Sequence, residues 1–301
     1  MDYGRPLEFG ISIVPEAGLL AQSRALVQAA DANGLDLVGI QDHPYQRRFL
    51  DTWMLMASLL AETEHIRIFP DVANLPLRLP TMIAKEAATL DVLSSGRFEL
   101  GLGAGAFWDA IEAMGGPRRA PAEAIGALEE AIAIIREAWS DVRSVQHDGR
   151  FYRAHGYHPG PPPAHPIEIW IGAYKPKMLH LTGRLADGWL PSLGRLSVDD
   201  LAAMHALVDE GARAAGRDPS AVRRLLNVSG SIGEASTAGG VGSLDGGLGG
   251  SVDEWVERVS GWVVESGFDT FIMWPGATET SQVDVWARRV VPGVRDAVGS
   301  R

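Results

Sequence analysis

Residues 84–105, AKEAATLDVLSSGRFELGLGAG, are the stretch that decides the fold. The first half carries Ala and Leu at helical spacing, and Gly96 marks the point where a helix ends. The run RFELGL that follows suits a buried strand, and GAG after it is a turn of small residues. A helix that leads through a tight turn into a buried strand is one unit of an alternating α/β fold.

The same unit recurs along the chain. Short apolar runs predict eight strands, near residues 7–13, 37–41, 66–72, 97–102, 167–171, 188–191, 225–229 and 270–274. Amphipathic segments predict eight helices, near 18–33, 51–63, 80–94, 121–140, 177–186, 198–215, 252–266 and 281–298. Capping side chains are expected at Asp51, Thr81, Ser251 and Ser281. The pattern favours one (β/α)8 TIM barrel over residues 1–301, in preference to a doubly wound open sheet, which usually stops at about six strands.

Two segments interrupt the repeat. Residues 144–166 predict a hairpin around His147 to Arg150, followed by a Pro-rich excursion that leads to the fifth strand. Residues 229–251 contain nine glycines and no aromatic residue, which predicts a flexible loop after the seventh strand. Such a loop is either a lid over the site or a tolerated surface insertion.

Composition excludes several classes of function. The chain has 27 Lys and Arg against 38 Asp and Glu, for a net charge of −11, so nucleic acid and anionic membranes are not expected as partners. It has no Cys, which excludes disulfides, thiolate metal sites and a Cys nucleophile. No signal peptide and no membrane-spanning run is evident, so we expect a cytoplasmic protein.

In a TIM barrel the chemistry lies at the carboxyl ends of the strands, and three such ends stand out. Asp42-His43 follows the second strand and is an acid–base pair, a metal site or a helix cap. Gly103-Ala104-Gly105 follows the fourth strand, where small residues either admit a flat ligand or allow tight packing. The acidic residue that a dinucleotide fingerprint requires falls inside a helix, so that interpretation is rejected.

The third strand end, Gly172-Ala173 followed by Lys175 and Lys177, suits an anionic group at a helix start, with solvated surface lysines as the alternative. Four histidines, His147, His155, His158 and His165, lie in the excursion, but none of their spacings presents two rings to one ion. We therefore expect no metal site.

Taken together, the strand ends resemble the bacterial luciferase-like superfamily of flavin- and deazaflavin-dependent oxidoreductases. The resemblance rests on FGI at 9–11, Asp42-His43, NLPLR at 74–78, AKEAATLD at 84–91, SGRFELGLGAG at 95–105, IWIGA at 169–173 and LADGW at 185–189. These motifs span most of the chain in the expected order.

The resemblance implies FMN or coenzyme F420 bound across the strand ends, and a homodimer. It implies that His43 lies near the redox ring, with Asp42 orienting it, and that Val72, Ala73 and Asn74 form a bulge behind the ring. A non-prolyl cis peptide is expected there, at 72–73 or 73–74. Gly103, Ala104 and Gly105 are expected beside the ring, and Gly172, Ala173, Lys175 and Lys177 toward a phosphate.

One position departs from the pattern. Deazaflavin sugar-phosphate dehydrogenases of this superfamily carry a Glu just after the glycine turn, where this chain has Ala106. The expected function is an F420- or FMN-dependent oxidoreductase or monooxygenase acting on a small organic substrate, and the departure at Ala106 disfavours oxidation of a sugar phosphate. A separate reductase is a possible partner. The alternatives are a flavin-binding barrel without catalysis and, less favoured, a metal-dependent hydrolase.

Overall fold

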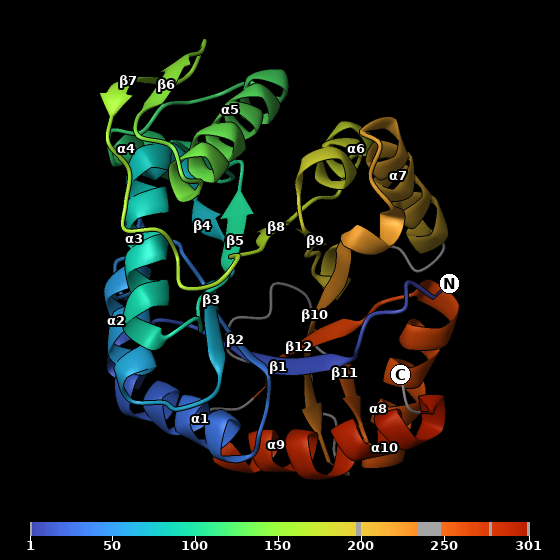
Figure 1. The fold of residues 1–301 in the computed structure, drawn as a ribbon. Coiled ribbons are helices and arrows are strands. Elements are labelled where there is room, and N and C mark those ends of the chain that lie inside the picture. Colours follow the sequence, from blue (N-terminus) through green and yellow to red (C-terminus); the bar gives the residue numbers. More distant parts are fainter. Residues whose placement is uncertain (1, 197–199, 234–247, 277–278, 300–301) are drawn as a thin grey trace.

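Parallel strands form a nearly closed barrel that helices surround (Figure 1). The computed structural model describes residues 2–196, 200–233, 248–276 and 279–299. The sheet runs in the order β3-β2-β1-β12-β10-β9-β8-β5-β4, with β11 beside β10. The strands are β1 Glu8–Ile13, β2 Leu37–Ile40, β3 Arg67–Pro70, β4 Ala73–Asn74, β5 Leu100–Gly103, β8 Ile169–Ile171, β9 Gly188–Trp189, β10 Arg223–Ile232, β11 Leu248–Gly250 and β12 Thr270–Pro275.

The two ends of this path meet. Ile68 of β3 pairs in parallel with Phe98, just before β5, and β4 pairs with β5. The strands β3 and β4 are therefore two halves of one barrel strand, separated by Asp71 and Val72. Counted in this way the barrel has eight strand positions, which confirms the predicted TIM barrel.

The helices confirm the predicted alternation. They are α1 Leu20–Ala32, α2 Thr52–Ala61, α3 Pro80–Ser94, α5 Pro121–Trp139, α6 Pro176–Leu185, α7 Leu201–Ala214, α8 Val252–Gly261, α9 Thr280–Val285 and α10 Val291–Val298. Single π turns at Trp262–Ser266 and Trp286–Val290 continue α8 and join α9 to α10. The sequence did not predict α4, Trp108–Ala113, which follows the glycine turn.

Two of the four predicted caps are present. The Asp51 carboxylate accepts hydrogen bonds from the backbone N–H groups of Trp53 and Met54, and Ser251 forms a capping box with Glu254. The prediction was wrong for Thr81, because Pro80 already occupies the first helical position and Leu79 is the cap residue. It was also wrong for Ser281, which lies inside α9.

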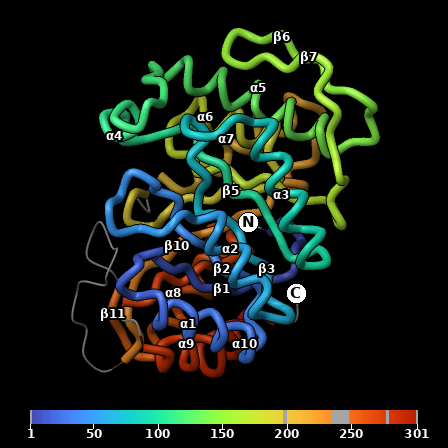
Figure 2. The backbone as a smooth tube through the Cα atoms, turned by 90° about the vertical axis from the view of Figure 1, so that its left-hand side faces the viewer, coloured from blue at the N-terminus to red at the C-terminus, as the bar shows by residue number. Residues whose placement is uncertain are grey.

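The hairpin is present as β6 Val145–Asp148 and β7 Arg153–Tyr157, which pair in antiparallel fashion. It lies beyond α5, at the end of the molecule opposite to α9 and α10 (Figure 2). The predicted loop at 229–251 is wrong at both ends, because β10 continues to Ile232 and β11 pairs with it. Gly230 permits this pairing, since a Cβ there would lie 2.3 Å from the Leu248 carbonyl oxygen. Residues 234–247 of this segment, and with them any lid, lie outside the described residues.

A separate apolar cluster lies inside the barrel. It consists of Leu37, Phe69, Trp170, Leu190, Leu225 and Ile272, each from a barrel strand or directly after one. Val72, between β3 and β4, packs against this cluster. The barrel interior is therefore filled by side chains, which form a floor beneath the strand ends.

Candidate functional site

A cavity of about 900 Å³ opens at the carboxyl ends of the strands. This volume lies in the range of small-molecule sites. All but one of the residues that the sequence predicted for the site line it, namely Asp42, His43, Val72, Ala73, Asn74, Gly103, Ala104, Gly105, Gly172, Lys175 and Lys177. The exception is Ala173, which is buried behind the cavity, where its carbonyl oxygen accepts a hydrogen bond from the Trp189 indole.

His43 lies against two aromatic rings. Its imidazole stacks on Tyr45, with ring centres 5.4 Å apart, and meets the edge of Phe107 at the same distance. Burial, with the positive charge of Arg195, lowers the pKa of His43 to about 4. The imidazole is therefore neutral at physiological pH and can accept a proton.

Phe107 follows the glycine turn in a left-handed backbone conformation, with φ of +54°, and its side chain is 48% exposed. This conformation is uncommon for a bulky residue and is found most often at functional sites.

Asp42 is buried and supports the backbone of the site. One of its carboxylate oxygens accepts the backbone N–H of Asn74 at 3.0 Å and lies 3.8 Å from the Arg78 guanidinium. Burial raises the pKa of Asp42, although the Asn74 hydrogen bond opposes this. In the described part of the chain Asp42 makes no hydrogen bond to His43. Its hydrogen bond with Asn74 ties the end of β2 to β4, and none of its contacts with described residues orients the His43 imidazole.

The bulge behind the predicted ring position lies between β3 and β4. The non-prolyl cis peptide is Asp71–Val72, one peptide bond before the positions that we predicted. A Cβ on Gly103 would lie 2.7 Å from Val72 Cγ2, and one on Gly101 would lie 2.2 Å from the Pro70 carbonyl oxygen. Gly101 thus serves tight packing, whereas Gly103 both makes room for Val72 and forms part of the cavity wall.

Cations gather at the β8 side of the cavity. Lys175 and Lys177, two of the three lysines in the sequence, flank the start of α6 and are exposed. Arg195 lies above the Tyr174 ring, 5.9 Å from its centre, while the Tyr174 hydroxyl accepts the backbone N–H of Ser192. None of the three cations makes an ion pair with a described residue, so their charges are available to an anionic group.

Sequence reasoning missed several residues of the cavity: Tyr45, Asp71, Phe107, Arg195 and Asn227. Asp71 directly follows the apolar strand β3, and Asn227 lies inside the apolar strand β10. A polar residue in or next to an apolar strand was the one signal in the sequence that could have revealed them. Trp274, in β12, also lines the cavity.

The excursion histidines have other partners than a metal. His165 bonds to Asp91 and His158 to the Arg143 carbonyl oxygen. The described residues hold no group of three or more His, Asp or Glu arranged to bind a metal ion. Nor does any described helix combine the length and apolar character that crossing a membrane requires.

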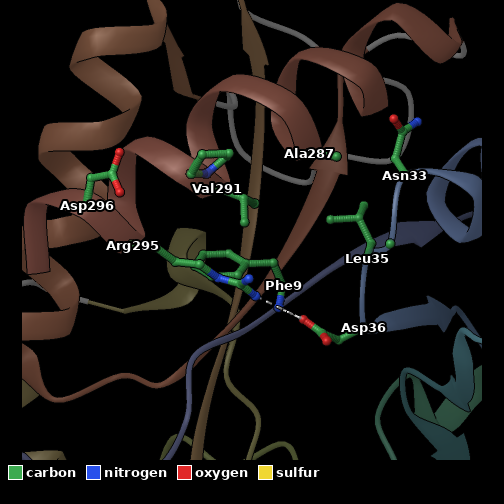
Figure 3. A pocket seen from close by; sticks show the side chains of 10 residues that line it. Phe9, Asn33, Leu35, Asp36, Ala287, Val291, Arg295 and Asp296 are labelled. Atoms are coloured by element: carbon green, nitrogen blue, oxygen red, sulfur yellow. Dashed lines mark hydrogen bonds and ion pairs between the residues drawn. The ribbon is translucent and has the colours of Figure 1, made fainter. Parts of the chain in front are cut away.

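A second, smaller cavity of about 270 Å³ lies between β1 and α10 (Figure 3). Asp36 and Arg295, which line it, already have partners. Asp36 accepts the backbone N–H of Phe9 at 2.8 Å and lies 4.0 Å from Arg295, whose guanidinium lies over the Phe9 ring. Nothing in this cavity suggests a ligand.

Comparison with known proteins fits this geometry. A 5,10-methylenetetrahydromethanopterin reductase from Archaeoglobus fulgidus is 32% identical over 186 residues, which cover 61% of this chain and 52% of that protein. An F420-dependent glucose-6-phosphate dehydrogenase from Kineococcus radiotolerans is 28% identical over 235 residues, 75% of this chain and 68% of that protein. The chain therefore spans about half to two thirds of the length of these relatives.

Solved structures confirm the fold. An F420-dependent secondary alcohol dehydrogenase in complex with an F420-acetone adduct aligns with a TM-score of 0.84, over 97% of this chain and 100% of that chain, at 18% identity. The family model described as luciferase-like monooxygenase matches residues 7–238. Since this match covers most of the sequence, the chain belongs to the luciferase-like monooxygenase family.

Proposed function

We propose that this chain is an oxidoreductase that binds coenzyme F420 or FMN in the large cavity and exchanges a hydride with a small organic substrate. One observation carries the proposal: one cavity combines a wall of small residues, the bulge at Val72 to Asn74, a neutral histidine and cations that make no ion pair with a described residue. The Kineococcus relative is an F420-dependent dehydrogenase, which favours F420 over FMN.

The residues of the cavity fit such a cofactor. Gly103, Ala104 and Gly105 face the bulge at Val72 to Asn74, and this wall presents no charged side chain to a flat ring. Lys175 and Lys177 would hold the anionic tail, near the backbone of Gly172. When bound, the cofactor would supply the hydride chemistry, and the protein would supply position and electrostatics.

His43 is the group that we assign to proton handling. As a neutral base it would accept, at an imidazole nitrogen, the proton that a substrate hydroxyl releases on oxidation. Tyr45 and Phe107 hold the ring in place by stacking and edge contact. Asp42 acts indirectly, because it fixes the backbone of Asn74.

The substrate is expected to differ from a sugar phosphate, although several relatives, the Kineococcus protein among them, are F420-dependent glucose-6-phosphate dehydrogenases. This chain has Ala106 at the position where the sugar-phosphate dehydrogenases of the superfamily that it resembles have a Glu. The next residue is the exposed Phe107. An apolar group suits this part of the cavity better than a polyol does.

The family description supports one alternative, oxygenation by reduced FMN that a separate reductase supplies. We also propose that the chain forms a homodimer in the cytoplasm. Large apolar side chains are exposed on α2 and α3, including Met54 at 67% and Leu93 at 75%. Exposed apolar surface of this kind is typical of an interface.

Titration of the purified protein with F420 and with FMN, each followed by cofactor fluorescence, tests the cofactor. We expect micromolar binding of at least one of them, and an affinity at least tenfold weaker in a Lys175→Ala/Lys177→Ala variant. Lys85→Ala, at the remaining lysine, is the matched control and should bind normally. Binding of a nicotinamide dinucleotide in place of both would contradict the proposal.

A further inference from the structure

Asp71 lies at the floor of the large cavity, at the end of β3 and directly before Val72. It is partly exposed, and the cavity is the space onto which it opens. Gly39 of β2 makes room for it, because a Cβ at Gly39 would lie 3.1 Å from both Cβ and Oδ2 of Asp71. The carboxyl group is therefore held inside the barrel mouth.

A chain of hydrogen bonds reaches Asp71 from the cavity wall. The Trp274 indole N–H donates to Asn227 Oδ1 at 3.0 Å. An indole nitrogen can only donate, so the Asn227 amide must present its oxygen to Trp274 and its NH₂ group to Asp71. Accordingly, Asn227 Nδ2 donates to Asp71 Oδ1 at 3.2 Å.

The other carboxyl oxygen faces Ser12 of β1, which is buried. Ser12 Oγ lies 3.0 Å from the Gly39 carbonyl oxygen and 3.5 Å from Asp71 Oδ2. A hydroxyl has one hydrogen, which can point to only one of these two acceptors, and the carbonyl oxygen is the nearer. When the hydrogen points to the carbonyl oxygen, Ser12 presents only lone pairs to Asp71 Oδ2, and that contact is favourable when Asp71 carries a proton.

We propose that Asp71 works as a neutral carboxylic acid, a positioning residue whose hydrogen bonds through Asn227 fix Trp274 at the cavity wall. All donors then point one way, from Trp274 through Asn227 and Asp71 to Ser12 and the Gly39 carbonyl oxygen. The link to the cofactor rests on the proposed function, because it requires that a cofactor cover the mouth of the cavity.

The surroundings of Asp71 favour the neutral form. Ser12 of β1, Gly39 of β2 and Asn227 of β10 face it, and none of them is charged. Asp42 and His43, the other titratable groups on this floor, do not contribute to its shift. Burial raises the pKa of Asp71 to about 7 and outweighs the hydrogen bonds with Asn227 and Ser12, which act in the opposite direction. A ligand that covers the cavity would remove the remaining water and disfavour the ionised form further.

The pH dependence of cofactor affinity tests the proposal. If the bound state requires neutral Asp71, the affinity of the wild-type protein should fall about tenfold between pH 6 and pH 8. Asp71→Asn supplies a carbonyl acceptor and an N–H donor in the same positions, so its affinity should change less than twofold over this range. Ionisation of the cofactor itself affects the binding of both proteins equally, so the difference between their pH dependences reports on Asp71 alone. Asp36→Asn, a carboxyl near the second cavity, should keep the wild-type dependence.

Breaking the chain of hydrogen bonds should weaken cofactor binding even at pH 6, where Asp71→Asn should bind as the wild type does. Asn227→Leu leaves the Trp274 N–H without an acceptor, and we expect affinity about tenfold weaker at pH 6. Weak binding by Asp71→Asn at pH 6, or an unchanged pH dependence in that variant, would overturn the proposal.

A second readout needs no cofactor. Carboxyl carbon NMR of Asp-labelled protein, with Asp71→Asn used to assign the signal, should show one carboxyl that ionises near pH 7. Stability should also change with pH. Because the pKa of Asp71 is higher in the folded than in the unfolded state, its ionisation lowers the free energy of unfolding as the pH rises from about 4 to 7. Asp71→Asn should therefore gain melting temperature relative to wild type over this range. Ionisation of Asp71 near pH 4 would refute the proposal even if no cofactor bound, and that result is separate from failure of the proposed function.

Discussion

At the scale of single residues, His43 and Asp42 have environments that their adjacency in the sequence does not reveal. The low pKa of His43 follows from burial and from Arg195, which joins it from a distant segment. Asp42 has turned to the backbone of Asn74. Neighbours in the sequence at a strand end thus lie in two different surroundings, His43 against aromatic rings in the cavity and Asp42 against the backbone.

The first prediction concerns the protonation of His43. Below a pH of about 4 the ring is charged and cannot accept a proton, so kcat/KM for substrate oxidation should fall as the pH decreases through this value. His43→Asn should keep cofactor affinity, lose roughly 10²-fold in turnover and lack this acid limb. His155→Asn, on the exposed strand β7, is the control and should behave as wild type. Unchanged turnover in His43→Asn would remove the residue from the mechanism.

The motif residues of the site could be predicted because they are local to strand ends, where a TIM barrel concentrates its chemistry. Asp71, Asn227 and Arg195 could not. Their roles depend on closure of the barrel, which brings β1, β3, β10 and the segment after β9 together, and no spacing along the sequence encodes that meeting.

At the scale of elements, His165 ties the Pro-rich excursion to the barrel through two ionic contacts. His165 Nδ1 lies 2.7 Å from Asp91 of α3, and its Nε2 lies 3.4 Å from Glu99. Asp91 also accepts the backbone N–H groups of Ala164 and His165. The hydrogen bonds of the His165 imidazole to Asp91 and Glu99 raise the pKa of His165 to about 9, although burial opposes the shift.

The pH dependence of stability follows from this contact. The pKa of His165 is higher in the folded state than its value of about 6.5 in the unfolded chain. The contact therefore contributes fully below pH 6.5 and is lost as the pH rises through 9. We expect the melting temperature to fall between pH 7 and pH 9.5, and His165→Gln to show a smaller fall. His158→Gln, on the same excursion, is the control, and an equal fall in His165→Gln would contradict the assignment.

Most elements were predicted because the apolar periods are strong, and the errors have local causes. Pro80 fixes the start of α3, which makes Thr81 an interior residue. The glycines at 230 and 249 suggested a loop, whereas both belong to paired strands, and Gly230 allows β10 and β11 to approach closely. The sequence did not predict α4 because this helix has only six residues and directly follows a glycine turn, which indicates a loop.

At the scale of the whole molecule, charges are divided between the two ends of the barrel. At the amino ends of the strands, Arg67 pairs with Glu8 and Glu99, and Arg223 pairs with Glu8 and Glu168. At the carboxyl ends, the cations of the large cavity make no ion pair with any residue in the described ranges. The amino end therefore pairs these charges for stability, whereas Lys175, Lys177 and Arg195 at the carboxyl end suit the anionic group of the proposed cofactor.

The exposed apolar face of α2 and α3 belongs to the same scale, because the proposed homodimer would bury it. Leu79, Met82 and Leu93 recur at intervals close to whole helical turns, so they lie on one side of α3, and Met54 is exposed on the adjacent α2. Leaving such side chains in water costs free energy that burial against an identical face would recover.

We therefore expect light scattering to give the mass of two chains of 32.3 kDa at micromolar concentration. Leu79→Lys/Leu93→Lys should give monomers, because four like charges would face each other across a symmetric interface. Val142→Lys, an exposed apolar residue elsewhere, should remain dimeric. None of these positions lines the large cavity, so the monomeric variant should still bind cofactor. A wild-type protein that is monomeric at these concentrations would show that the face has another partner or none.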